Sequence, residues 1–165
     1  MDRSALAAVT TLLLSLAPGF EGRYAVIAGV ALGLDPLLSI LVSCIGDAIL
    51  ALALATAASY IDRLLLWLAD RGGAAGRAAS YLLHKIASAR VKVERYVRRW
   101  GAIGLALFVA APIPVTGVWT GALVGYLIGL DRRRLALALA VGGLASVLVI
   151  GIPLAAASRL GVGTQ

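Results

Sequence analysis

The sequence has little of the chemistry on which soluble enzymes depend. It contains 1 Cys and 1 His, so Cys44 has no partner for an internal disulfide and His84 has no second histidine for a metal site. It has no Walker loop, no glycine-rich dinucleotide turn and no Ser/His/Asp set. We therefore expect no enzymatic activity, no cofactor and no metal ion.

Charge is also scarce. Only 14% of the residues are charged, whereas 61% are hydrophobic and the mean hydropathy is +0.97. A soluble core of 165 residues cannot bury so much apolar surface, so the bilayer must be the solvent for most of the chain. The net charge of +7 arises largely from the segment 62–99. Because this basic segment lies between apolar ones, we expect it to meet anionic membrane lipids rather than nucleic acid.

Two prolines interrupt the most distinctive stretch, residues 111–121. Pro112 and Pro114 must end the apolar helix expected over 101–110, and Thr116 can then cap a new helix. Glycines follow at a strict spacing of four, which is the small-xxx-small pattern of packed membrane helices. They are Gly117, Gly121, Gly125 and Gly129.

An earlier part of the chain repeats this order of features. A shift of ninety-six residues places Pro114 on Pro18 and the triplet Gly129-Leu130-Asp131 on Gly33-Leu34-Asp35. The same shift places Gly125 on Gly29 and Gly142 on Gly46. Both copies contain an apolar arm, a Pro/Gly break, a helix of small residues, a turn ending in Asp and a long apolar run. We interpret this as an internal duplication, with Gly29 and Gly33 as the packing glycines of the first copy.

Segment lengths then predict the organisation of a single membrane domain, 1–165. The arms on either side of the Pro18-Gly19 break, and those on either side of Pro112, are shorter than the roughly 20 residues that cross hydrocarbon. Such arms indicate hairpins that enter and leave by the same face. The predicted segments are a re-entrant hairpin over 4–34, a span over 37–58, a basic amphipathic connector over 59–100, a second hairpin over 101–130 and a span over 135–157.

The number of membrane crossings in each repeat sets the topology. Repeat 1 (4–58) crosses the membrane once, which is an odd number, so repeat 2 (101–157) begins on the opposite side of the membrane. Its orientation is therefore inverted relative to repeat 1, as in many secondary transporters. The predicted fold is therefore an all-α integral membrane protein with an inverted repeat. The positive-inside rule places the connector in the cytoplasm and both termini outside the plasma membrane. Two spans give little protein to surround two hairpins, which favours a homodimer. A solvated basic helix is the alternative for the connector.

Three charges are predicted at membrane depth: Glu21, Arg23 and Asp47. A charge at this depth costs free energy unless it forms an ion pair or is hydrated. In one interpretation Arg23 forms a structural ion pair with Glu21 or Asp47. In the other, Arg23 binds an anionic substrate while Glu21 or Asp47 takes up a proton.

The two breaks add a second element to this site. After each break a half-helix begins near the membrane midplane, so its N-terminus offers free N–H groups and a positive dipole end. Gly19 and Thr116 would expose these donors, and together with Arg23 they would form an anion site. Glu21 would instead neutralise one helix end, and the sequence leaves both uses open.

The motifs resemble a known family. Residues 112–123 (PIPVTGVWTGAL) closely resemble the signature of the small multidrug export protein family, a branch of the DedA/VTT-domain superfamily. Glu21-Gly22-Arg23-Tyr24-Ala25 is similar to that family's Glu-x-Arg-Gly-Ala motif, with Tyr24 in place of the glycine. The resemblance implies two opposed re-entrant hairpins, each followed by a span, and transport of a polyprenyl-phosphate lipid or related amphiphile with proton or cation coupling. Glu21 and Arg23 carry over by position.

The leading hypothesis is thus a small multidrug exporter or lipid flippase with a midplane site between the hairpins. A structural, membrane-organising protein and a holin-like pore are the alternatives. The pore is disfavoured by the glycine spacing and the paired charges.

Overall fold

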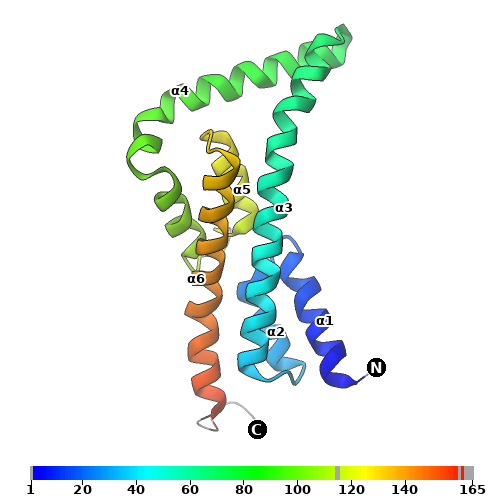
Figure 1. Ribbon diagram of the computed structural model, residues 1–165, viewed down its shortest axis with the longest axis vertical. Coiled ribbons are helices and arrows are strands. Elements are labelled where there is room, and N and C mark those ends of the chain that lie inside the picture. Colours follow the sequence, from blue (N-terminus) through cyan, green and yellow to red (C-terminus); the bar gives the residue numbers. More distant parts are fainter. Residues whose placement is uncertain (1, 114–115, 160, 162–165) are drawn as a thin grey trace.

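The computed structural model describes residues 2–113, 116–159 and 161, and the side chains of all of these except 89–90 and 92–99. Within these residues the only regular structure is helical (Figure 1). The helices are α1 (Arg3–Leu16), α2 (Glu21–Ala31), α3 (Pro36–Asp70), α4 (Gly73–Ala110), α5 (Val118–Leu127) and α6 (Arg132–Arg159). The all-α prediction is therefore confirmed for the described part of the chain.

Two long helices, α3 and α6, run side by side through the centre of the molecule (Figure 1). They are the two helices that are long and apolar enough to cross a membrane among the described residues. At 1.5 Å per residue, the 35 residues of α3 extend about 52 Å, well beyond a hydrocarbon core of about 30 Å. α3 therefore continues past the end expected at residue 58.

Two short hairpins pack against this pair from opposite ends (Figure 1). α1 rises from the lower end and α2 returns to it, both against α3; the last part of α4 descends from the upper end and α5 returns. With 14 residues in α1 and 10 in α5, these arms are too short to cross a bilayer. The turn at 17–20 meets the described residues of the α4–α5 connection, 111–113 and 116–117, beside α3 and α6 (Figure 1).

The two turns that lead from the hairpins into the long helices have the same local structure. Gly33 and Gly129 adopt positive φ angles of +86° and +79°, which end α2 and α5 as glycines commonly do. The next residue donates in both turns to a carbonyl five positions back, Leu34 to Gly29 and Leu130 to Gly125, at 3.0 Å. An aspartate then caps the following helix. Each residue of the first turn therefore corresponds to the residue ninety-six positions later in the second turn.

Glycines allow the hairpin arms to approach the long helices closely. A Cβ on Gly142 of α6 would lie 2.7 Å from the carbonyl oxygen of Ala106 in α4, and one on Gly46 of α3 would overlap Ser15 of α1. Gly121 and Gly125 of α5 face Leu105, Val109 and the α6 leucines, as the spacing predicts.

The outer glycines do not lie on a helix face as expected: Gly33 and Gly129 form turns, whereas Gly117 packs against the Glu21 carboxylate, which a Cβ at this position would overlap. Gly33, Gly117 and Gly129 lie outside the helices, because α2 ends at Ala31 and α5 spans only Val118–Leu127. A Cβ on Gly33 would meet nothing within 4 Å. Gly29 retains its packing role, against Thr11 of α1 and Ser39 of α3.

The connector does not end where the second hairpin was expected to begin. α4 continues without interruption through residue 100 to Ala110, crossing above the core and then bending down beside α6 (Figure 1). Cations cover aromatic rings on the part of α3 and α4 that projects beyond the core. The pairs are Arg63 over Tyr60, Arg71 over Trp67 and Lys85 over Tyr81.

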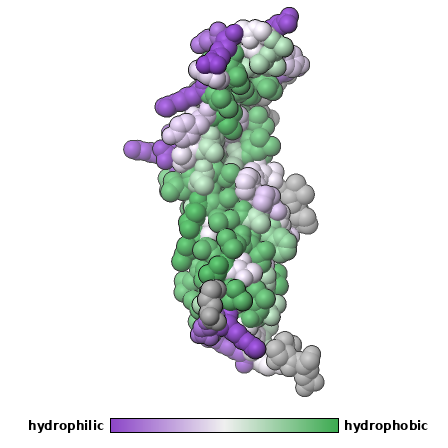
Figure 2. All heavy atoms as spheres, turned by 90° about the vertical axis from the view of Figure 1, so that its right-hand side faces the viewer, coloured by the Kyte–Doolittle hydropathy of each residue, from purple (hydrophilic) through white to green (hydrophobic). Residues whose placement is uncertain are grey.

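On the face shown in Figure 2, apolar side chains cover the middle of the molecule between two hydrophilic ends. Many large apolar residues of the spans and hairpin arms are about half exposed, including Leu41, Ile45 and Leu107. A water-soluble protein of this size does not expose a continuous apolar band, so this surface is suited to lipid.

Candidate functional site

The structure brings the four predicted site residues to the place where the hairpin turns meet. Glu21 and Arg23 lie in the first turn of α2, Asp47 lies in the first half of α3, and Thr116 precedes α5. The three charged residues are buried, with 6%, 4% and 1% of their surface exposed, respectively. We call these four residues the tip cluster.

Glu21 caps a helix of the other hairpin. Its carboxylate accepts hydrogen bonds from the backbone N–H groups of Val118, at 3.0 Å, and Trp119, at 3.2 Å. These are free donors of the first turn of α5, where a negative charge is also favoured by the helix dipole. Glu21 therefore neutralises this helix end, which is one of the two uses that the sequence left open.

Thr116 does not cap α5, and this corrects the expectation. The N-cap residue is Gly117, and the single hydroxyl hydrogen of Thr116 is shared between the carbonyls of Ala111 and Ile113, at 2.8 and 2.9 Å. The hydroxyl thus closes the turn that follows α4. Pro112 lies in this turn as predicted, whereas Pro114 lies outside the described residues.

Arg23 joins its own hairpin to the other one. Its guanidinium forms an ion pair with Glu21 at 3.1 Å and donates to the carbonyls of Ala111 and Ile113, each at 3.2 Å. It also donates to the carbonyl of Thr116. Arg23 therefore binds carbonyls of the turn that follows α4, and the ion pair with Glu21 is confirmed.

Asp47 caps the first hairpin in the same manner. Its carboxylate accepts a hydrogen bond from the N–H of Gly22 at 2.7 Å, at the beginning of α2. The carboxylate fits between two glycines, since a Cβ on Gly22 or on Gly143 of α6 would lie 2.7 or 3.0 Å from its Oδ2 atom. Asp47 is linked to Glu21 and Arg23 through this backbone contact.

Gly143 is a site residue that the sequence reasoning missed. A signal for it existed, because the shift of ninety-six residues that relates the two halves places Asp47 on Gly143. The same shift relates Gly22 to Val118, and both of these N–H groups are capped by a carboxylate from another element. The two half-helices thus begin in equivalent ways.

The backbone at Glu21 is strained. Its φ angle of +53° is the only positive value among the described non-glycine residues. Left-handed backbone in a residue of this type costs about 1–3 kcal/mol and persists where the surroundings enforce it. Here the enforcing contacts are those of the Glu21 carboxylate with α5 and Arg23.

A cavity of about 210 Å³ lies beside the tip cluster. Both turns line it, through Pro18 and Gly19 on one side and Gly117 and Thr120 on the other. Glu21, Arg23, Tyr24 and Trp119 complete the lining. The indole N–H of Trp119 donates to the carbonyl of Leu16 at 3.3 Å, which adds a further contact between the hairpins.

In the described part of the chain no group of three His, Cys, Asp or Glu side chains is placed to hold a metal ion. The tip cluster instead offers two carboxylates, one guanidinium and two helix N-termini beside a small cavity. This arrangement can bind a proton, or an anion that displaces a carboxylate.

A family model described as "Putative small multi-drug export protein" matches residues 21–149, more than three quarters of the chain. The match begins at Glu21 and covers all four residues of the tip cluster. Searches of curated proteins and of solved structures find no match. Export takes place across a membrane, in agreement with the two apolar helices α3 and α6. The chain is a membrane protein and belongs to the small multi-drug export protein family.

Proposed function

We propose that this protein is a transporter that moves an anionic amphiphile, of the polyprenyl-phosphate class, across the plasma membrane through the tip cluster. In this proposal α3 and α6 span the bilayer, and the two hairpins are re-entrant elements of an inverted repeat. The basic connector faces the cytoplasm and both termini lie outside. The family description supports transport, and the resemblance to the DedA/VTT-domain superfamily supports the substrate class.

The observation that carries the proposal is the position of the Glu21 carboxylate. It binds the N-terminus of α5 and one N–H group at the edge of the Arg23 guanidinium, and these are the donors that would bind a phosphate headgroup. The cavity beside it opens between the two turns. An anionic substrate can therefore take the place of Glu21 without any new site being built.

Exchange of Glu21 for substrate provides a coupling mechanism. A proton that binds Glu21 removes its charge and weakens its contacts with Arg23 and with the N–H groups of Val118 and Trp119. The freed donors then bind the headgroup, and loss of the proton returns Glu21 to α5. Asp47 holds α2 in place meanwhile, since its contact with Gly22 does not involve Arg23.

The test uses protein reconstituted into liposomes with a fluorescent polyprenyl-phosphate analogue, with and without a pH gradient. The wild-type protein should move the analogue between leaflets, and Glu21→Gln should slow this movement at least about tenfold. Asp35→Asn, which removes an exposed carboxylate far from the tip cluster, should have no effect. If the wild-type protein moves neither this analogue nor a cationic drug under either condition, the proposal is wrong.

A structural role is the second candidate function. It is favoured by the fact that Glu21, Arg23 and Asp47 all have partners within the protein. In this case the tip cluster only holds the hairpins together at membrane depth. Glu21→Gln and Asp47→Asn would then lower the melting temperature, while liposomes with wild-type and variant proteins would show the same flux as empty ones.

A further inference from the structure

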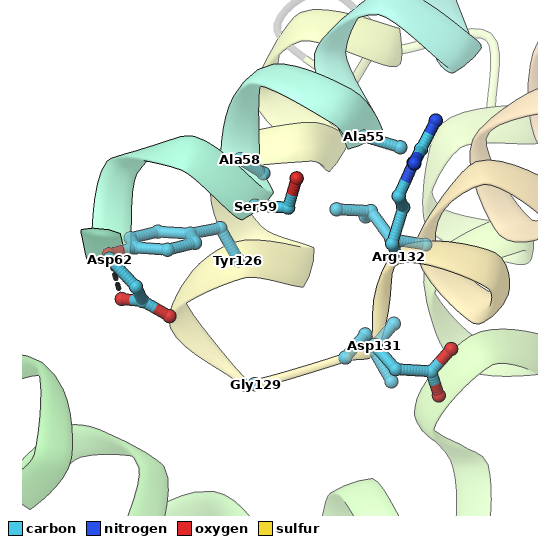
Figure 3. Close-up of a pocket in the computed structure, with 10 residues that line it drawn as sticks. Ala55, Ala58, Ser59, Asp62, Tyr126, Gly129, Asp131 and Arg132 are labelled. Carbon is cyan, nitrogen blue, oxygen red and sulfur yellow. Dashed lines mark hydrogen bonds between the residues drawn. The ribbon is translucent and has the colours of Figure 1, made fainter. Parts of the chain in front are cut away.

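A second cavity lies far from the tip cluster, between α3 and the turn that joins α5 to α6 (Figure 3). Its volume is about 310 Å³. α3 contributes Ala55, Ala58 and Ser59 to its lining, and the opposite wall is formed by Gly129, Arg132 and other residues of the turn.

The lining of this cavity is divided into an apolar and a polar part. Ala55, Ala58 and Leu135 are buried and apolar. On the polar side, Tyr126 donates its hydroxyl hydrogen to Asp62 at 2.7 Å, and Arg132 rises from the opposite wall (Figure 3). A molecule in the cavity would therefore meet alkyl groups, the guanidinium of Arg132, and the carboxylates of Asp62 and Asp131, both of which already accept hydrogen bonds from the protein.

Arg132 differs from the two arginines that follow it. Arg134 forms an ion pair with Asp131 at 3.2 Å, and Arg133 does not line the cavity. In the described part of the chain the guanidinium of Arg132 has neither an ion-pair nor a hydrogen-bond partner. Asp131 is engaged with the N-terminus of α6, where it accepts from the N–H groups of Arg133 and Arg134.

The cavity lies where the apolar length of α3 ends. At the level of the cavity α3 carries the pair Tyr60–Arg63, and beyond it the pair Trp67–Arg71; in each a cation covers an aromatic ring. Aromatic and basic side chains of this kind concentrate at the headgroup level of a membrane. The other end of the apolar surface lies near the beginning of α3 at Pro36, about twenty residues from the part of α3 that lines the cavity.

We propose that this cavity binds one phospholipid, with the phosphate held by Arg132 and the glycerol region placed against Ala55 and Ala58. Guanidinium groups bind phosphate through paired, charge-assisted hydrogen bonds. The bound lipid fastens the α5–α6 turn to α3. This site is distinct from the tip cluster, and the proposal does not depend on whether the protein transports anything.

The test measures binding of dioctanoyl phosphatidylglycerol to the purified full-length protein in neutral detergent, by native mass spectrometry. The wild-type protein should bind one molecule specifically, and Arg132→Gln should weaken this binding at least about tenfold. Arg133→Gln makes the same change in net charge next to the cavity and should leave the affinity unchanged. Ala58→Leu, which fills the apolar wall without altering charge, should also weaken binding.

Two controls distinguish the alternatives. Thermal unfolding without added lipid shows whether each variant is folded, and only folded variants are compared. Inorganic phosphate at millimolar concentration should not displace the lipid. Equal weakening by Arg132→Gln and Arg133→Gln would show general charge attraction and overturn the proposal, as would displacement by inorganic phosphate or full affinity in Ala58→Leu.

Discussion

The carboxylate of Glu21 accepts a hydrogen bond from the backbone N–H of Val118 at 3.0 Å, although the two residues are ninety-seven positions apart. The contact joins the beginning of one half-helix to that of another, and Arg23 reinforces it by binding Glu21 and the turn before α5. The two hairpins are thus held by a charged group that is almost inaccessible to solvent.

The ion pair of Glu21 and Arg23 should show strong energetic coupling. Removing one member leaves the other charge buried and unpaired, so Glu21→Gln or Arg23→Met alone should each lower the free energy of unfolding by about 3–5 kcal/mol. The double variant should lose clearly less than the sum of the single losses. Unfolding by denaturant in detergent micelles measures all four proteins. Additive losses would mean that the two side chains act independently.

Gly142→Ala should be destabilising because α4 and α6 are in backbone contact there. The added methyl group would lie 2.7 Å from the carbonyl oxygen of Ala106 and from Cβ of Val109, so the helices must separate, at a cost of about 1–3 kcal/mol. Gly104→Ala is the matched control, since its methyl group would meet only Trp100 at 3.4 Å. Comparison of melting temperatures checks this, and equal values would contradict the packing described.

The aspartates that cap the two long helices should contribute similarly. Asp35 accepts from the N–H groups of Leu37 and Leu38, and Asp131 does so at the beginning of α6. Loss of such a cap costs about 1 kcal/mol, so Asp35→Ala and Asp131→Ala should lower stability by comparable amounts. The melting temperature is again the measurement. A large difference between the two would show that the equivalent turns are not energetically equivalent.

The proposed orientation predicts which side of the membrane labels each segment. In a Cys44→Ala background, a cysteine replacing Arg77 should react with an impermeant maleimide only after the cell is opened, whereas one replacing Asp2 should react in intact cells. A cysteine replacing Gly19 should be protected in both cases. Labelling of positions 2 and 77 from the same side would exclude the proposed topology.

Much of the fold follows from local sequence alone. Apolar runs predict α3 and α6, the positions of Pro18 and Pro112 predict the breaks, and the repeated triplet Gly-Leu-Asp predicts two turns that the structure shows to be alike. These features are readable because chain stiffness, backbone donors and hydropathy act over a few residues. The predicted bounds of the helices were less accurate, since no local signal ends α3 at residue 58 or interrupts α4 at residue 100, where the connector was expected to end.

The sequence by itself determined that the chain is helical and apolar, and that three charges lie within apolar segments. Only the tertiary structure decided how those charges are used: Glu21 caps α5, Arg23 binds the turn after α4, and Asp47 caps α2. The physical reason is distance along the chain. A carboxylate cannot be assigned to a helix end ninety-seven residues away until packing brings them together, and Thr116, the local candidate for the cap, bonds to its own turn instead.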